Sequence, residues 1–163
     1  MTVTSRVPAL LDYLISLFTT AATLGAATPA VTIFDGPATT ELDPPLALYV
    51  GLLDPDNTGA EPAAESVQDW AAIGRLGRNE TITVHCCAQA WAGTDPAQSQ
   101  RVAAYGIVAA VETIMQADST QFGGNVLYPS PGITALALTQ NNTTIGAIVR
   151  VAFDLVFTAR IGG

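Results

Sequence analysis

Lysine is absent from this 163-residue chain, and charged residues of any kind are scarce. The six basic residues are all arginines, and charged residues make up 12% of the chain, where about a quarter is usual for a soluble domain. With 14 acidic residues, the formal net charge is −8. So few bases argue against a tight nucleic-acid-binding surface, which needs a basic footprint. The low charge also predicts a surface covered by assembly with other copies, the alternative being a monomer with a neutral polar surface.

Cysteine and histidine, which supply many metal ligands and nucleophiles, are nearly absent. The two cysteines, Cys86 and Cys87, are adjacent. Neighbouring strand residues point to opposite faces, so we expect two reduced thiols, typical of a cytosolic setting, and no disulfide. His85 is the single histidine, and one imidazole with two opposed thiols is not a metal-ligand set. The sequence therefore predicts neither a metal site nor a cofactor.

Motifs of common active sites are missing as well. The chain contains no G-x-S-x-G elbow, no phosphate-binding loop, no H-E-x-x-H and no G-x-G-x-x-G. His85, Asp69 and a serine can be assembled into a triad on paper, but nothing in their spacing brings them together. We expect His85 to be a hydrogen-bonded residue of a sheet and the protein not to be an enzyme.

No uninterrupted apolar run reaches the length of about 20 residues that a membrane span needs. Residues 7–30 are similar to a secretory signal in their apolar centre and A-x-A-like end. However, Arg6 is the one base before this segment, and Asp12 interrupts it. We therefore expect a cytosolic protein, and the identity of the mature N-terminus would distinguish it from an exported one.

What the sequence does contain is a strong strand pattern in residues 146–161. From Val149 to Ile161 every second residue is apolar, which predicts a strand with one face in a core. The alternate positions mix apolar and polar residues: Ile148, Arg150, Ala152, Asp154, Val156, Thr158 and Arg160. Because strands of about five or six residues are typical, this length predicts curvature or an extension beyond the subunit.

The rest of the chain supplies partners for this strand and helices to cover its apolar face. Apolar residues recur at helical spacing in residues 5–26, with Ser5 as the cap, and in a second helix that is capped by Thr94 or Asp95 and ends near Ala117. Further strands are predicted in residues 31–35, 46–53, 67–76, 81–91 and 133–140, followed by a turn at residues 141–144.

The order of these elements predicts an α+β fold. We expect a mainly antiparallel β-sheet with two α-helices packed on one face and a long C-terminal β-hairpin. Gly106, inside the second helix, is expected to allow close packing on the sheet. We find no internal repeat and no linker, so residues 1–163 are expected to form a single domain with a sizeable core.

The acidic residues are unevenly placed. One segment without a base holds eight of them: Asp35, Glu41, Asp43, Asp54, Asp56, Glu61, Glu65 and Asp69. Within this segment, residues 54–66 match several ligand positions of a calcium-binding loop. A strand and not a helix is predicted before them, and Glu61 followed by Pro62 stands where such loops are apolar. We therefore expect a flexible, solvated loop.

Taken in order, the elements resemble those of the tail terminator proteins of long-tailed bacteriophages, also called tail completion or tail-to-head joining proteins. The matching parts are the N-terminal amphipathic helix, the short strand ending in Asp35-Gly36, the strand 81–91, the helix opened by Asp95-Pro96, the Gly-Gly after it, and the final strand ending in Phe157-Thr158-Ala159-Arg160-Ile161. The resemblance spans nearly the whole chain, but it does not include the loop 54–66.

The resemblance implies a structural virion protein without enzymatic activity or cofactor. Such a protein forms a ring, typically of six copies, that caps the finished tail tube, stops its polymerisation and provides the surface on which the DNA-filled head docks. Its expected partners are copies of itself, the tail tube protein and a head-side neck or connector protein, while DNA passes through without specific binding. Its expected location is the head-proximal end of the virion tail, and the host cytoplasm during assembly.

Two groups of residues are candidates for these contacts. The polar positions of the last strand are expected to contribute to the subunit interface, with the first two pairing within or between subunits: Arg150, Asp154, Thr158 and Arg160. The acidic loops 35–45 and 54–66 are expected to face the lumen or the tube, where negative charge would repel DNA phosphates: Asp35, Glu41, Asp43, Asp54, Asp56, Glu61 and Glu65. The alternative for the last strand is an ordinary exposed sheet face.

Other interpretations of the sequence stay open. Within the virion, the chain could be a head completion or stopper protein, or a tail tube subunit, which would polymerise into long tubes where a terminator halts at one ring. From a different class, a small cytosolic ligand-binding or hydrolytic domain would use a pocket between the second helix and the sheet, with His85 and Trp91 at its mouth.

Overall fold

The computed structural model describes residues 4–39, 44–57, 59–71, 77–93, 96–127, 132–144 and 146–162. Within these residues the chain forms a mostly antiparallel six-stranded sheet with helices on one face, which confirms the expected α+β class. The helices are α1 (Val7–Thr20), α2 (Ala22–Gly25), α3 (Ala97–Ala117) and α4 (Gln121–Gly124).

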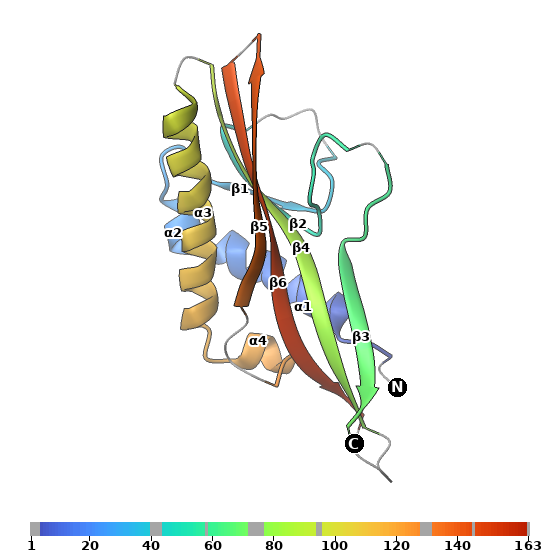
Figure 1. Cartoon of the computed structure of the whole chain (residues 1–163). Coiled ribbons are helices and arrows are strands. Elements are labelled where there is room, and N and C mark those ends of the chain that lie inside the picture. Colours follow the sequence, from blue (N-terminus) through green and yellow to red (C-terminus); the bar gives the residue numbers. More distant parts are fainter. Residues whose placement is uncertain are drawn as a thin grey trace.

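The sheet is built around two long antiparallel strands, β4 (Arg78–Ala92) and β6 (Gly146–Ile161). The shorter strands are β1 (Thr32–Asp35), β2 (Leu46–Val50), β3 (Ala64–Trp70) and β5 (Gly132–Thr143). The strand order is β1-β2-β4-β6-β5, and β3 pairs with the half of β4 that β2 leaves free. The β1–β2 pair is parallel and the other pairs are antiparallel. Figure 1 shows β5 on one side of the long strands and β3 on the other.

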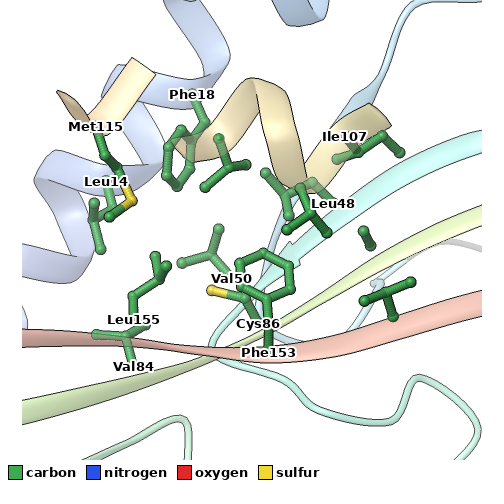
Figure 2. Packing of buried hydrophobic residues seen from close by; sticks show 14 of the residues in the cluster. Leu14, Phe18, Leu48, Val50, Val84, Cys86, Ile107, Met115, Phe153 and Leu155 are labelled. Atoms are coloured by element: carbon green, nitrogen blue, oxygen red, sulfur yellow. The ribbon is translucent and has the colours of Figure 1, made fainter. Parts of the chain in front are cut away.

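The core lies between one face of this sheet and the helices. β6 places every second residue in it, as the alternating pattern predicts: Val149, Val151, Phe153, Leu155, Phe157, Ala159 and Ile161. α1 contributes Leu10, Leu14 and Phe18 at helical spacing, and α3 contributes a stripe that includes Ile107 and Met115. Figure 2 shows Leu14, Phe18, Ile107 and Met115 on the helix side of this core, facing side chains of the strands. This side of the sheet is named the helix face below, and the opposite side the open face.

One carboxylate, that of Glu80 on β4, is buried on the helix face. It accepts hydrogen bonds from the Ser5 hydroxyl (2.5 Å), the Arg6 backbone N–H (2.7 Å) and the Gln68 side chain (3.2 Å). Burial alone would raise the pKa of Glu80, but these hydrogen bonds outweigh it and hold the pKa below its ordinary value of 4.5. The carboxylate therefore ties the chain before α1 to β3 and β4.

The N-terminal helical segment differs from the single helix predicted. It is interrupted at Ala21, whose backbone is extended (φ −68°, ψ 118°), and resumes as α2 for one turn. Arg6 and not Ser5 occupies the N-cap position, without a side-chain capping bond. The Ser5 hydroxyl accepts a hydrogen bond from the Val7 N–H and donates to Glu80, so its role is to join the helix to the sheet.

The second predicted helix is confirmed as α3, which ends at the expected Ala117. Its predicted caps Thr94 and Asp95 lie outside the described residues, and Pro96 stands at the N-cap position. The expectation that Gly106 allows close packing on the sheet is wrong. Gly106 is exposed, away from the buried stripe of α3, and a Cβ there would meet nothing within 4 Å beyond the helix's own backbone.

Strand boundaries differ from the prediction where pairing extends or shortens a strand. The predicted C-terminal hairpin is confirmed as β5–β6, but β5 continues to Thr143, so the turn predicted at residues 141–144 begins later, at Thr144. β2 ends sooner than predicted because Gly51 turns the chain with φ +82°, a conformation that favours glycine. β3 begins at Ala64 and ends at Trp70, and part of its predicted continuation falls outside the described residues.

Candidate functional site

The open face of the sheet carries the more polar half of the two central strands. Residues of β4 and β6 that do not enter the core point to this side. β4 contributes Thr81, Thr83, His85, Cys87, Gln89 and Trp91. β6 contributes Ile148, Arg150, Ala152, Asp154, Val156, Thr158 and Arg160, all half-buried except the exposed Arg160. The loop between β2 and β3, here named the covering loop (residues 51–57 and 59–63), lies on the side away from α3 (Figure 1).

His85 lies on the open face and is hydrogen-bonded through its side chain and its backbone. Its Nδ1 is 2.6 Å from Oδ1 of Asp154, its cross-strand partner on β6. The two side chains are 10% and 20% exposed. The His85 carbonyl accepts the N–H groups of Gly51 and Leu52, and its own N–H donates to Ala63, so the covering loop leaves and rejoins the sheet at this residue. The predicted hydrogen-bonded sheet histidine is confirmed.

The triad considered for His85 is not formed. Asp69 lies on β3 opposite Asn79, whereas the carboxylate beside the imidazole belongs to Asp154. Among the residues that the structure describes, no group of three or more His, Cys, Asp or Glu side chains is arranged to hold a metal ion. Within the described part of the chain, the acidic residues that match a calcium loop are therefore not arranged as a calcium site.

Cys86 and Cys87 are free thiols in separate apolar clusters. Cys86 belongs to the main core under the helices, and Cys87 packs with Tyr49 and Leu52 on the open face. This is the opposite orientation that their adjacency predicts. Burial raises the pKa of both thiols, that of Cys87 to about 12, so neither has the thiolate character of a reactive cysteine.

Arg150 joins the covering loop to the sheet. Its Nε donates to Oε1 of Gln89 (2.8 Å), its cross-strand partner on β4. Its Nη2 donates to Oδ1 of Asp56 (2.9 Å), and its Nη1 contacts the other oxygen of that carboxylate. The predicted Arg150–Asp154 pair is not formed within the chain, because four residues along one strand span about 13 Å and each side chain has a cross-strand partner instead.

The covering loop is braced by its own carboxylates. Asp54 accepts the N–H of Asp56 (3.0 Å), and Glu61 contacts the side-chain amide of Asn57. Between this loop and β5 lies a cavity of about 340 Å³. Its lining comprises Leu53, Asp54, Asp56, Thr139, Gln140, Asn141, Arg150 and Ala152.

The structure gathers some of the predicted acidic residues and not others. Asp54, Asp56 and Glu61 lie together in the covering loop, and Glu65 is exposed on β3, on the open face. Asp35 is exposed at the end of β1. The predicted lumen residues Glu41 and Asp43 lie outside the described residues. Whether these acids face a lumen or a tube stays a prediction, as does the interface role of the polar positions of β6.

The outer edge of β5, here named the β5 edge, is a feature that sequence reasoning missed. β5 ends the strand order, and its residues from Thr134 to Asn142 are all exposed. Leu136 is 52% exposed and Leu138 is 41% exposed. β5 contains no charged residue and no proline over its 12 residues. That uncharged run was the available signal for an exposed edge. However, the sequence of an edge strand cannot be distinguished from that of an inner strand until its neighbours are known.

The outer edge of β3, here named the β3 edge, is the second exposed strand with large apolar side chains. β3 pairs with β4, and the described residues provide no strand on its other side. Val67 and Trp70 are 64% and 70% exposed. The β3 and β5 edges lie on opposite sides of the two long strands (Figure 1).

No protein-family model matches this chain, and no curated protein matches its sequence. Among the described residues, no helix has both the length and the apolar character that crossing a membrane requires.

Proposed function

We propose that this chain is a tail terminator protein of a long-tailed bacteriophage, a structural subunit that forms a ring on the tail tube. The ring stops tube polymerisation and provides the docking surface for the DNA-filled head. Its partners are copies of itself, the tail tube protein and a head-side neck or connector protein. The observation that carries the proposal is the long, uncharged and exposed β5 edge, which suits a subunit completed by its neighbours.

The amount of exposed surface supports a subunit of an assembly. The chain exposes 8962 Å². A compact monomer of 16.8 kDa is expected to expose about 7,700 Å². The excess, about 1,300 Å², means that the chain is less compact than such a monomer, as expected of a subunit that is completed by its neighbours.

The charge distribution favours a passage that DNA slides through and does not favour a surface that binds DNA. The chain has a net charge of −8, which a ring multiplies by its number of copies. The carboxylates of the covering loop add negative charge to the open face, where the Arg150 guanidinium is already bound to Asp56. A negative surface repels phosphates, so DNA is expected to slide past without sticking.

Purified protein and growing tail tubes provide the test. We expect the native mass from light scattering to be a multiple of the 16.8 kDa chain, and electron microscopy to show rings. When the protein is added to polymerising tail tube protein of the same phage, mean tube length should fall as the proportion of terminator rises, with a ring at one end of each tube.

Other outcomes would assign the chain elsewhere. Polymerisation of the purified protein alone into long tubes would make it a tube subunit. Rings that bind the head side without shortening tubes would make it a completion or stopper protein. A monomer at high concentration that also ignores tube ends would contradict a virion role and favour a small ligand-binding domain.

A further inference from the structure

We propose that β5 of one copy pairs antiparallel with β3 of the next copy, so that identical subunits extend one another's sheets head to tail. This pairing rests on the proposed ring-forming role and names the surfaces that would join the subunits. A head-to-tail contact uses two different patches of the same chain, as any ring of more than two copies requires.

The β5 edge lacks the features that protect free edge strands. Such strands are commonly very short or carry charges or proline. β1, at the other end of the strand order, has this protection, because it spans four residues, ends in Asp35 and is followed by Pro37. β5 has 12 residues without charge or proline, and its one irregularity is a bulge between Thr134 and Ala137. A partner strand is therefore expected to cover this edge.

The β3 edge matches the β5 edge in length and in its exposed large apolar side chains, although β3 also carries Glu65 and Asp69. β3 has seven residues, the same as the regular part of β5 that follows its bulge. Val67 and Trp70 give β3 the most exposed large apolar side chains of the sheet within the described residues. Pairing the two edges would remove these side chains and those of β5 from water together.

The strand directions permit this pairing in a ring. β3 is antiparallel to β4, β4 to β6, and β6 to β5, so β3 and β5 run in opposite directions within one copy. Rotation about a ring axis preserves the direction of each strand relative to that axis. β5 of one copy therefore meets β3 of the next in the antiparallel sense, in which residues stand directly opposite each other.

One register places two of the exposed apolar side chains, Leu138 and Trp70, opposite each other. Leu138 points to the helix face, since it pairs with the core residue Val151. Trp70 points the same way, since it is an even number of positions from Ser66, the partner of Ile82. Placing Leu138 opposite Trp70 sets the other pairs as Gln140 with Gln68, Asn142 with Ser66, Asn141 with Val67, Thr139 with Asp69 and Thr143 with Glu65. Two of the three amides then meet polar partners, the third, that of Asn141, meets Val67, and both carboxylates meet hydroxyl groups.

Tyr105 of α3 is placed to extend this contact. Nη1 of Arg101 lies 3.2 Å from Oε1 of Gln140, so the side chain of Arg101 reaches from the first turns of α3 to β5. α3 and β5 run in opposite directions (Figure 1). Tyr105, one helical turn or about 6 Å beyond Arg101, is therefore level with Leu138, about 6.6 Å back along β5. Tyr105 is 41% exposed, and Trp70 of the next copy would pack against both side chains.

Pairing of either edge with its own copy is less favourable. Two β3 strands paired about Val67 place Glu65 of each copy opposite Asp69 of the other, and like charges directly opposite are destabilising. Two β5 strands paired about the middle of their regular part place Leu138 opposite Asn142, so that the apolar side chains do not meet.

Leu138→Cys and Trp70→Cys combined in one chain test this pairing. In the proposed register the two thiols of neighbouring copies face each other at the spacing that a disulfide can bridge. Mild oxidation should shift the protein on a non-reducing gel from monomer to a ladder of three or more joined copies, while each single variant stays monomeric. The native Cys86 and Cys87 are buried free thiols and give little background.

Leu138→Cys combined with Val102→Cys is the matched control, because Val102 is 70% exposed on α3 and has no place in the register. An equal ladder from this control would overturn the pairing, since random collision would explain both. A covalent dimer from Leu138→Cys alone would assign the β5 edge to a second β5 that is paired about Leu138. Absence of any cross-link would indicate that a strand of another protein covers the β5 edge. Each of these three results would overturn the pairing of β5 with β3.

Failure of this pairing is distinguishable from failure of the proposed function. If the wild-type protein forms rings and arrests tubes but the double variant gives no ladder, the pairing alone is overturned. If the ladder forms but tube growth continues unchanged, the terminator function is overturned and the pairing stands.

Discussion

At the residue scale, removing the charge of Glu80 is expected to destabilise the protein at neutral pH. The ionised carboxylate holds the chain before α1 against the sheet through Ser5, Arg6 and Gln68. Glu80→Gln should lower the free energy of unfolding by about 1.5–3 kcal/mol, the range for hydrogen bonds to charged groups. Chemical denaturation followed by circular dichroism measures this difference.

The same difference should depend on pH. Because the pKa of Glu80 is lowered in the folded state, its contribution to stability is fully present above the ordinary value of 4.5 and is lost as pH falls through the folded-state pKa. The gap between wild type and Glu80→Gln should therefore narrow in acid. Asp12→Asn, at an exposed carboxylate of α1, is the matched control. A gap for Glu80→Gln that stays constant from neutral pH to about pH 3 would contradict this account.

For single residues, the sequence predicts the face of the sheet on which a side chain lies, but it does not predict the cross-strand partner of that side chain. The alternation in β6 places Arg150 and Asp154 on the same face, as observed. Their partners, Gln89 and His85, depend on how β4 aligns with β6, two strands separated by α3 in the chain. No local pattern encodes that register, because it emerges from the packing of the whole sheet.

At the scale of elements, loss of the Arg150 guanidinium is expected to loosen the covering loop. Arg150 binds Asp56 through two nitrogens, and its side chain is 12% exposed. Arg150→Gln should raise the rate of proteolysis within the covering loop about fivefold, as expected when opening becomes about 1 kcal/mol easier. Limited proteolysis with mass spectrometry measures it, and Arg160→Gln on the same strand is the control. Equal cleavage of both variants would show that Arg150 does not hold the loop.

Two glycines should respond in opposite ways to alanine. At Gly106 the helix is exposed and a Cβ has room, so Gly106→Ala should raise the free energy of unfolding by about 1 kcal/mol. At Gly146, with φ +129°, a Cβ would overlap the carbonyl oxygen of Ala92, so Gly146→Ala should cost about 2–4 kcal/mol. Thermal unfolding should separate the two by opposite shifts of Tm. A lowered Tm for Gly106→Ala would contradict the open surroundings of this position.

Elements were predictable where a period persisted over many residues. β4, β6 and α3 each repeat an apolar position over at least ten residues, and their extents are close to those predicted. β5 was cut short in the prediction, because Asn141 and Asn142 favour a turn in isolation. In the structure both asparagines pair with residues of β6, and this strand pairing overrides their local preference for a turn.

At the scale of the whole molecule, a charge on the β5 edge is expected to prevent assembly. Lysine on an edge strand blocks pairing with another strand. Leu138→Lys should therefore weaken self-association at least tenfold, which corresponds to about 1.4 kcal/mol. Val102→Lys makes the same change on the outer side of α3 and should retain the wild-type mass. Sedimentation velocity over a range of concentrations measures both, and identical masses for the two variants would contradict a role for the β5 edge.

The arrangement of the whole molecule was only partly predictable. The class, and the placement of helices on one face, follow from element order and apolar stripes. The identity of the edge strands does not follow from the sequence. β2 and β3 pair with different halves of the same side of β4, and no local sequence pattern predicts this division. The candidate assembly surfaces therefore became visible only with the topology.

The two adjacent cysteines give this fold a pair of internal reporters. Cys86 becomes reachable by an alkylating reagent when the helix layer parts from the sheet, and Cys87 when the cluster with Tyr49 and Leu52 opens. Both thiols fall in one proteolytic peptide, so mass spectrometry can read two labelling rates from a single sample. The ratio of those rates measures whether the layers on the two sides of one strand breathe independently or together.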